Sequence, residues 1–146
     1  MQHALLLAQK AATQGEVPVG ALVVHNQRII GQGWNKREQL PCATAHAEIL
    51  AIQEACRTLG QWRLVGCALY VTLEPCFMCA GAIVSARLDR VIYGASDPKA
   101  GAVESLAKLL HDGRLNHQCS VVEGGILSEE CGKALKEFFQ KKRKNI

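Results

Sequence analysis

The chain of 146 residues has the length of a single domain, and 49% of its residues are hydrophobic, which excludes an intrinsically disordered protein. Its net charge of +4 is weakly basic, so it permits a nucleic-acid partner without requiring one. No apolar run approaches the roughly 18 residues of a membrane span, and no basic leader precedes the first apolar stretch. We therefore expect one cytoplasmic domain over residues 1–146, with no membrane partner and with its seven cysteines reduced.

The hydrophobic pattern predicts helices and strands along the whole chain. The first helix, over residues 2–14, has an apolar face made of Ala4, Leu7, Ala8 and Ala11. The further elements are strands at 17–24 and 28–34, a helix at 45–59 capped by Thr44, a strand at 67–73, a helix at 76–87 with Pro75 in its first turn, a strand at 90–95, a short helix near 102–111, a strand at 120–124 and a helix at 128–144. This order predicts an α/β fold, a three-layer α/β/α arrangement with a five-stranded mixed sheet, in which the last two strands can lie parallel.

Two motifs, thirty positions apart, carry candidate metal ligands. Cys76 and Cys79 are separated by one helical turn, so both sulfurs can lie on the same face of a helix, and His46 stands near the start of the preceding helix. Zinc accepts nitrogen and sulfur ligands in a tetrahedral arrangement, and three protein ligands leave the fourth position to water, as in catalytic sites. The sequence therefore predicts one Zn²⁺ held by His46, Cys76 and Cys79.

Glu48, two positions after His46, is the candidate general base. The two residues are about 200° apart around an ideal helix, so only the geometry of a helix start lets both reach one cavity. A capping box requires a spacing of three, whereas Glu48 lies four positions after Thr44. A carboxylate without that role can take a proton from a metal-activated water and pass it on. The combination of H-x-E with P-C-x-x-C is a signature of zinc nucleobase deaminases.

Other interpretations of the cysteines stay open. A redox pair is disfavoured by the proline before C-x-x-C and by the matched H-x-E motif. Cys42, four residues before His46, could complete a closed Cys₃His site of the structural type, which would leave Glu48 without a role. The remaining cysteines, together with Phe77 and Met78, are predicted to pack in the interior: Cys56, Cys67, Cys119 and Cys131.

The segments around these motifs resemble the bacterial tRNA-specific adenosine deaminases of the cytidine-deaminase-like superfamily. The similar stretches are EVPVGALVV, GWN, TAHAEI, LYVTLEPCFMCAGA and YGASDPKAGA, and the similarity extends over nearly the whole chain. The resemblance implies a cytidine deaminase-like fold and a single zinc-dependent domain of the CMP/dCMP type. It also implies a homodimer with one zinc ion per subunit, each site being bordered by the neighbouring subunit.

The same resemblance implies a reaction and a set of substrate contacts. The expected reaction is hydrolytic deamination of adenosine to inosine at the wobble position, 34, of a tRNA anticodon, with release of ammonia. Asn35 is expected to contact the base, and Asp97 and Lys99 the nearby nucleotides of the anticodon stem-loop. Phe138 stands next to a basic tail, KKRKN, a combination that suits stacking of bases and binding of phosphate but is also typical of a solvated helix end.

Two other functions remain open from the sequence. A deaminase of a free base or nucleoside, of the guanine or cytosine type, would share the zinc motif without needing the basic tail. A zinc-stapled RNA-binding protein without activity would need Cys42 as a fourth ligand.

Overall fold

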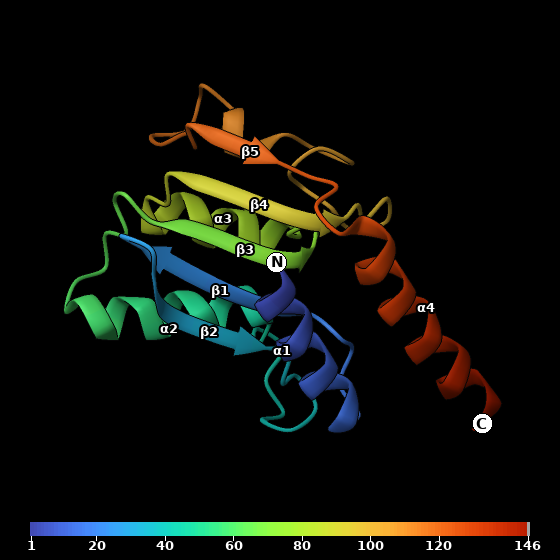
Figure 1. Ribbon diagram of the computed structural model, residues 1–146. Coiled ribbons are helices and arrows are strands. Elements are labelled where there is room, and N and C mark those ends of the chain that lie inside the picture. The colour runs from blue at the N-terminus through green and yellow to red at the C-terminus, as the bar shows by residue number, and fades with distance from the viewer. Residues whose placement is uncertain (146) are drawn as a thin grey trace.

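A five-stranded sheet with the strand order β2-β1-β3-β4-β5 forms the centre of the computed structural model, which describes residues 1–145 (Figure 1). The strands are β1 Gly20–His25, β2 Arg28–Trp34, β3 Ala68–Leu73, β4 Arg90–Ala95 and β5 Val121–Glu123. Strand β1 is antiparallel to both β2 and β3, whereas β3, β4 and β5 are mutually parallel. The predicted mixed sheet is therefore confirmed, including the parallel pair at its end.

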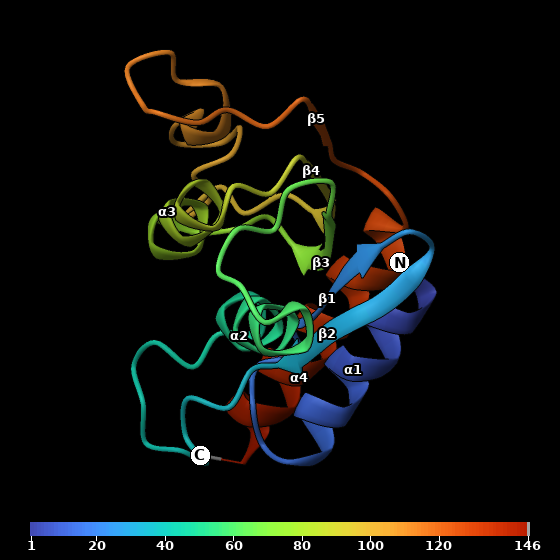
Figure 2. The same ribbon diagram turned by 90° about the vertical axis from the view of Figure 1, so that its left-hand side faces the viewer.

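Four α-helices cover the two faces of this sheet: α1 Gln2–Thr13, α2 Ala47–Leu59, α3 Phe77–Ala86 and α4 Ser128–Lys144. Seen along the sheet, α2 and α3 lie on one face and α1 and α4 on the other (Figure 2). The apolar face predicted for the first helix is the buried face of α1. The three-layer α/β/α arrangement is the predicted one.

Glycines in the sheet let the helices approach it closely. A Cβ atom at Gly20 of β1 would overlap the backbone of α1, and one at Gly31 or Gly33 of β2 would overlap the backbone of α2. The close contact between β2 and α2 fixes where α2 begins relative to the end of the strand. Between the layers, the core contains buried residues of β1, β3 and β4, among them the fully buried Leu69, Val71 and Val91, whereas β2 and β5 add only partly buried side chains.

Three details of the predicted elements are wrong. Helix α2 begins at Ala47, with an extended His46 as its N-cap (φ −75°, ψ 153°), because the Lys36 N–H donates to the carbonyl of Ala45 and holds the preceding segment outside the helix. Cys76 is the N-cap of α3, so Pro75 precedes the helix and does not lie in its first turn. Residues 102–105 form turns, not a helix, because a buried carboxylate accepts the amides of residues 103–105. Only the short η1 Leu109–His111 follows.

Burial of the other predicted interior residues is mixed. Cys67, Cys119 and Cys131 are buried and Cys56 is half-buried. Phe77 is 50% exposed, so the prediction that it packs inside is wrong; as the first residue of α3 it faces solvent. Among residues 1–145, no helix combines the length and the apolar character that a bilayer crossing requires.

Candidate metal centre and adjoining cavity

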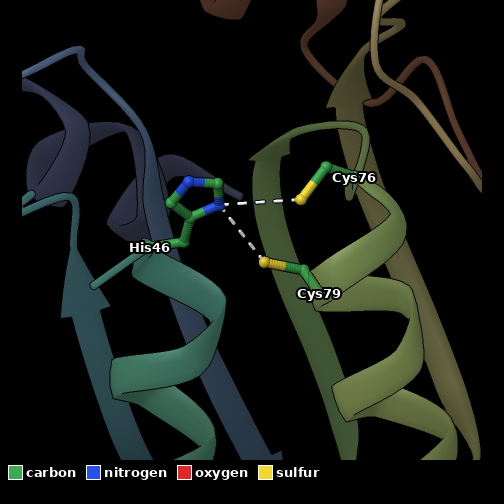
Figure 3. Close-up of side chains that lie close together, drawn as sticks. All are labelled: His46, Cys76 and Cys79. Carbon is green, nitrogen blue, oxygen red and sulfur yellow. Dashed lines mark hydrogen bonds between the residues drawn. The ribbon is translucent and has the colours of Figure 1, made fainter. Parts of the chain in front are cut away.

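The starts of α2 and α3 bring three metal-ligating side chains together (Figure 3). His46 is the N-cap of α2, Cys76 is the N-cap of α3, and Cys79 lies one turn into α3. Nδ1 of His46 is 3.7 Å from Sγ of Cys76 and 3.4 Å from Sγ of Cys79. All three donor atoms lie within 4.8 Å of one another. The three residues that the sequence singles out as ligands therefore meet in space.

The chain reaches this cluster from β2 and β3, the two strands that flank β1. Strand β3 leads through three residues into α3, and the longer loop after β2 leads into α2, so both helices begin at the same edge of the sheet. At a helix start the unpaired N–H groups and the helix dipole favour negative charge. Cys76 is therefore in a position that stabilises a thiolate, the form of cysteine that binds metals.

The donor set and its spacing fit zinc. In a tetrahedral site with Zn–N and Zn–S bonds of about 2.0 and 2.3 Å, the nitrogen and sulfur ligands lie about 3.5 Å apart, close to both distances observed here. One imidazole and two thiolates match the ligand preference of this metal. Cys42 is not part of the cluster: its Sγ pairs with the hydroxyl of Thr44 at 3.3 Å. The closed Cys₃His arrangement is therefore absent from the described residues.

The pKa values of the two thiols in the cluster are shifted in opposite directions. Hydrogen bonding to Cys79, and then to His46, lowers the pKa of Cys76 to about 3 in spite of partial burial. The hydrogen bond with Cys76 and burial raise the pKa of Cys79, and the hydrogen bond with Cys76 also raises the pKa of His46. Because ligands must be deprotonated to bind a metal, metal binding at this cluster releases protons.

A cavity of about 160 Å³ adjoins the cluster. His46 and Cys76 form part of its wall, and the loop after β2 contributes Asn35 and Arg37. The loop after β4 contributes Asp97 on another part of the wall. Apolar side chains form much of the remaining wall, among them Val17 and Leu73. The cavity therefore combines an apolar lining with a few convergent polar groups, as small-molecule sites do.

Glu48 lines the same cavity from the first turn of α2. Its side chain is only 4% exposed. Burial raises the pKa of its carboxyl, while hydrogen bonding to its own backbone and the positive charge of His46 act in the opposite direction. Because His46 is the extended N-cap and not a helical residue, the two side chains are not constrained to opposite sides of α2. The structure thus provides the helix-start geometry that the predicted role of Glu48 needs.

The four candidate substrate contacts divide into two groups. Asn35 and Asp97 line the cavity beside the cluster. Lys99 does not line it; this residue is exposed, and its backbone N–H donates to the Asp97 carboxylate at 3.1 Å. Phe138 lies on α4 in a separate groove that it shares with Leu5 and other residues of α1.

Glu16, which the sequence motifs do not single out, shapes one loop of the cavity wall. Its side chain is 1% exposed, and its two carboxylate oxygens accept the backbone N–H groups of Glu38 at 3.1 Å and Gln39 at 2.8 Å. These bonds hold the loop that carries Asn35 and Arg37. The available signal is an acidic residue between a glycine turn and the apolar VPVG run, where a surface charge would be unexpected.

Glu74 has the same role in the loop after β4, and the sequence motifs do not single it out either. It is 2% exposed and accepts the N–H groups of Asp97 at 3.0 Å, Val103 at 3.2 Å, and Glu104 and Ser105 at 2.9 Å; the Ser105 hydroxyl donates as well. Burial favours the neutral carboxyl, but the hydrogen bonds from Ser105, Glu104 and Asp97 dominate and lower the pKa of Glu74 to about 2. An acid at the end of a buried strand, in the stretch LEPC, is the corresponding signal.

Comparison with known proteins identifies close relatives. The model of the MafB19-like deaminase family matches residues 1–143. The tRNA-specific adenosine deaminase of Bacillus subtilis (strain 168) is 52% identical over 144 residues, which cover 99% of this chain and 89% of that protein. The enzyme of the same description from Haemophilus influenzae is 48% identical over 144 residues, covering 98% of this chain and 83% of that protein.

Solved structures agree with these relatives. A structure from a study of A-to-I editing by tRNA:A34 deaminases at the wobble position has a TM-score of 0.88 and 46% sequence identity, covering 92% of this chain and 97% of the other. A guanine deaminase from Bacillus subtilis has a TM-score of 0.63 and 41% identity, but over only 65% of this chain and 61% of the other.

Proposed function

The chain belongs to the family of bacterial tRNA-specific adenosine deaminases, among the MafB19-like deaminases, and we propose on this premise that it converts adenosine to inosine at position 34 of a tRNA anticodon. The reaction is hydrolytic: water replaces the 6-amino group, which leaves as ammonia. One observation carries the proposal, namely that the buried carboxyl of Glu48 shares a single cavity with the metal-ligating cluster.

We assign one Zn²⁺ per subunit to His46, Cys76 and Cys79. Bound there, zinc supplies a Lewis acid that makes a water molecule nucleophilic near neutral pH. The protein contributes the geometry, because the two helix starts fix an imidazole and two thiols at the spacing that one ion requires. The position of Cys42 outside the cluster leaves the fourth ligand site open.

Glu48 moves the protons in this proposal. Its carboxylate accepts a proton from the attacking water and donates it to N1 of the purine, which makes C6 electrophilic. The same carboxyl then transfers the second proton of that water to the departing amino group. A residue that acts as base and acid within one turnover benefits from a pKa raised towards neutrality, and burial acts in this direction on Glu48.

Asn35 and Asp97 hold the base in the proposed complex. The side chain of Asn35 is fixed, because its Nδ2 donates to the Val17 carbonyl at 3.4 Å and its Oδ1 accepts the Arg37 N–H at 3.3 Å. The cavity is on the scale of one nucleobase, so the reacting nucleotide has to turn out of its stack. This costs least for a base that is already unpaired, as in an anticodon loop. We assign Lys99 and Phe138, which lie outside the cavity, to contacts with neighbouring nucleotides.

A homodimer in the cytoplasm completes the proposal. The outer side of α2 and α3 carries an apolar groove of about 300 Å³, lined by Ile52, Trp62 and Ala82 among others. Trp62 is 53% exposed, and Phe77 at the start of α3 is half-exposed too. We assign this face to a second copy of the chain. Trp62→Glu is then expected to yield monomers by sedimentation, whereas a dimer that persists in this variant would contradict the assignment.

The test of the activity uses a tRNA with adenosine at position 34. The wild-type protein is expected to produce inosine, and Glu48→Ala is expected to lose this activity while retaining zinc. Glu129→Ala, which removes an exposed acid from the first turn of α4 outside the cavity, is the matched control and should keep the activity. Absence of inosine with the zinc-loaded wild type, or full activity in Glu48→Ala, would contradict the proposal.

A second candidate is deamination of a free base, which the likeness to a guanine deaminase favours. The same protein is therefore incubated with guanine, cytosine and cytidine, and ammonia is measured. Ammonia from these compounds without inosine in the tRNA would support this second function. Cys42→Ala tests the inactive structural-zinc alternative: zinc retained in that variant excludes it.

A further inference from the structure

A basic surface lies at the open edge of the sheet, outside the cavity. Strand β2 is the edge strand, and Trp34 is its last residue. The Lys10 ammonium of α1 lies 4.1 Å from the centroid of the Trp34 ring, and the Lys36 ammonium lies 4.2 Å from it. We call Lys10, Trp34 and Lys36 the edge patch. They line one groove together with residues that include Glu54 and Arg57 of α2.

The Trp34 ring is itself fixed. Its indole N–H donates to the side-chain oxygen of Gln14 at 2.9 Å. The ring also packs against the small apolar cluster formed by Ala4, Leu7 and Leu22. Each lysine is attracted to the face of an aromatic ring that cannot move freely. The edge patch therefore presents two cations in defined positions, unlike lysines on mobile surface side chains.

The two cations lie close together because both contact the Trp34 ring. The two centroid distances put the ammonium groups at most about 8 Å apart, so their charges repel at low salt. Neither forms an ion pair with a carboxylate anywhere in residues 1–145, and Glu54 lines the groove without pairing with them. Two adjacent cations without acidic partners suit a ligand with several negative charges.

The edge patch is continuous with the mouth of the cavity. Lys36 stands between Asn35 and Arg37, and both of these residues line the cavity. The Lys36 N–H also donates to the Ala45 carbonyl at 3.0 Å, immediately before the metal-ligating His46. A single loop thus places alternate residues in the cavity and on the edge patch. A chain of nucleotides with one base in the cavity can therefore pass the edge patch with its backbone.

We propose that the edge patch binds backbone phosphates of the RNA on one side of the reacting nucleotide. The inference rests on the proposed function, which supplies an RNA as the substrate. Lysine ammonium groups bind phosphates as point charges, and such contacts position a nucleic acid without reading its sequence. The edge patch extends the substrate surface from the cavity to the edge of the sheet along β2.

The test compares two double variants that lose the same charge. Lys10→Gln/Lys36→Gln removes both cations of the edge patch. Arg28→Gln/Lys108→Gln removes two exposed cations elsewhere, one of them at the other end of β2. Binding of a labelled anticodon stem-loop is measured by fluorescence anisotropy over a series of salt concentrations. The edge-patch variant is expected to bind about tenfold more weakly at low salt, with a salt slope reduced by about 1.5, since each phosphate contact contributes roughly 0.7–0.9. The control variant should stay within about twofold of wild type.

Further measurements separate charge from folding. Lys10→Arg/Lys36→Arg keeps both charges and both ring contacts, and it is expected to bind like wild type. If the double glutamine variant unfolds at a lower temperature than the control, the single variants Lys10→Gln and Lys36→Gln are measured in its place. Each single variant is expected to show about half of the reduction in the salt slope.

Each alternative outcome has a distinct meaning. Equal binding by the edge-patch and control variants, with inosine still formed by the wild type, would overturn the edge patch and leave the proposed function in place. Absence of inosine in the wild type would refute the proposed function, while the binding series, which needs no turnover, still decides the edge patch. If the edge-patch variant binds RNA like wild type but forms an assembly of different mass, the edge patch mediates contacts between copies of the chain. This outcome would overturn the inference.

Discussion

The loop after β2 and the loop after β4 both line the cavity, and each is built around one buried carboxylate from elsewhere in the chain. Glu16 accepts two backbone N–H groups of the first loop. Glu74 accepts four backbone N–H groups and a hydroxyl from the second. Residues 36–41 of the first loop are largely exposed, whereas Gly101, Ala102 and Val103 of the second are buried. The loop after β4 is therefore part of the core, and the loop after β2 is attached to the core at two points.

This difference has a consequence for the site. The loop after β4 also contacts the metal-ligating helix start, because the Ala102 N–H donates to the Pro75 carbonyl at 2.9 Å and Gly101 bridges to Cys76. A disturbance at Glu74 is thus transmitted to Cys76, a proposed zinc ligand. A disturbance at Glu16 reaches Asn35 and Arg37, which line the polar part of the cavity wall. We expect the first to impair folding, metal binding and turnover together, and the second to impair substrate binding.

The largest effect is expected for Glu74→Gln. The carboxamide presents an NH₂ group to a set of backbone donors, so several buried N–H groups lose their acceptor at a cost of about 3–5 kcal/mol in unfolding free energy. Urea unfolding measures this cost, and zinc content and inosine formation should both fall. Glu123→Gln, at an exposed site, is the control. A variant as stable as that control would contradict the assigned role of Glu74.

The pH dependence of stability provides a second test of the same carboxylate. The pKa of Glu74 is lowered to about 2 in the folded chain, from an ordinary value of 4.5. Ionised Glu74 therefore stabilises the fold above pH 4.5, by roughly 3 kcal/mol, and this contribution disappears as the pH falls from 4.5 through about 2. In acid titrations of the unfolding free energy, the gap between wild type and Glu74→Gln should shrink over this window. A gap that stays constant would show that the charge of Glu74 does not stabilise the loop.

Gly101→Ala is expected to have an intermediate effect. A Cβ atom at this position would overlap the Glu74 carboxylate, so the loop or the carboxylate has to shift, at about 1–3 kcal/mol. Because Gly101 bridges to Cys76, the shift should also weaken zinc binding in a competition with a chelator. Gly113→Ala, where the added methyl group meets open space, should change neither quantity. Unchanged zinc affinity in Gly101→Ala would separate this loop from the metal centre.

The cluster of candidate metal ligands was predictable from the sequence, whereas the supports of the loops were not. Cys76 and Cys79 are related by the pitch of one helix, and H-x-E supplies the complementary donor types, so residue identity and spacing suffice. Glu16 and Glu74 instead bind backbone N–H groups that lie 22–31 positions further along the chain. Every residue except proline carries such a donor, so the sequence does not mark which ones a buried carboxylate will accept.

Two errors have the same origin in tertiary contacts. Thr44 is a good N-cap by residue type, but the bond from Lys36 to the Ala45 carbonyl keeps this segment extended and gives the cap position to His46. The predicted helix near 102–111 fails because Glu74 accepts amides that a helix would have used. Of the elements themselves, β2, β4 and α4 have the predicted bounds, since turn and loop residues flank their patterns.

The smallest effect is expected for Glu16→Gln, and it decides whether the two loops really differ. Only two N–H groups depend on this carboxylate, so the loss of unfolding free energy should be about 1–2 kcal/mol, less than for Glu74→Gln. A looser loop holds Asn35 and Arg37 less well, so KM for the stem-loop should rise about fivefold while kcat changes less than about twofold. Glu38→Gln alters an exposed side chain whose backbone N–H still donates to Glu16, which makes it the matched control. A fall in kcat and zinc content like that of Glu74→Gln would mean that both loops support the metal centre; a rise in KM alone assigns the loop after β2 to the substrate.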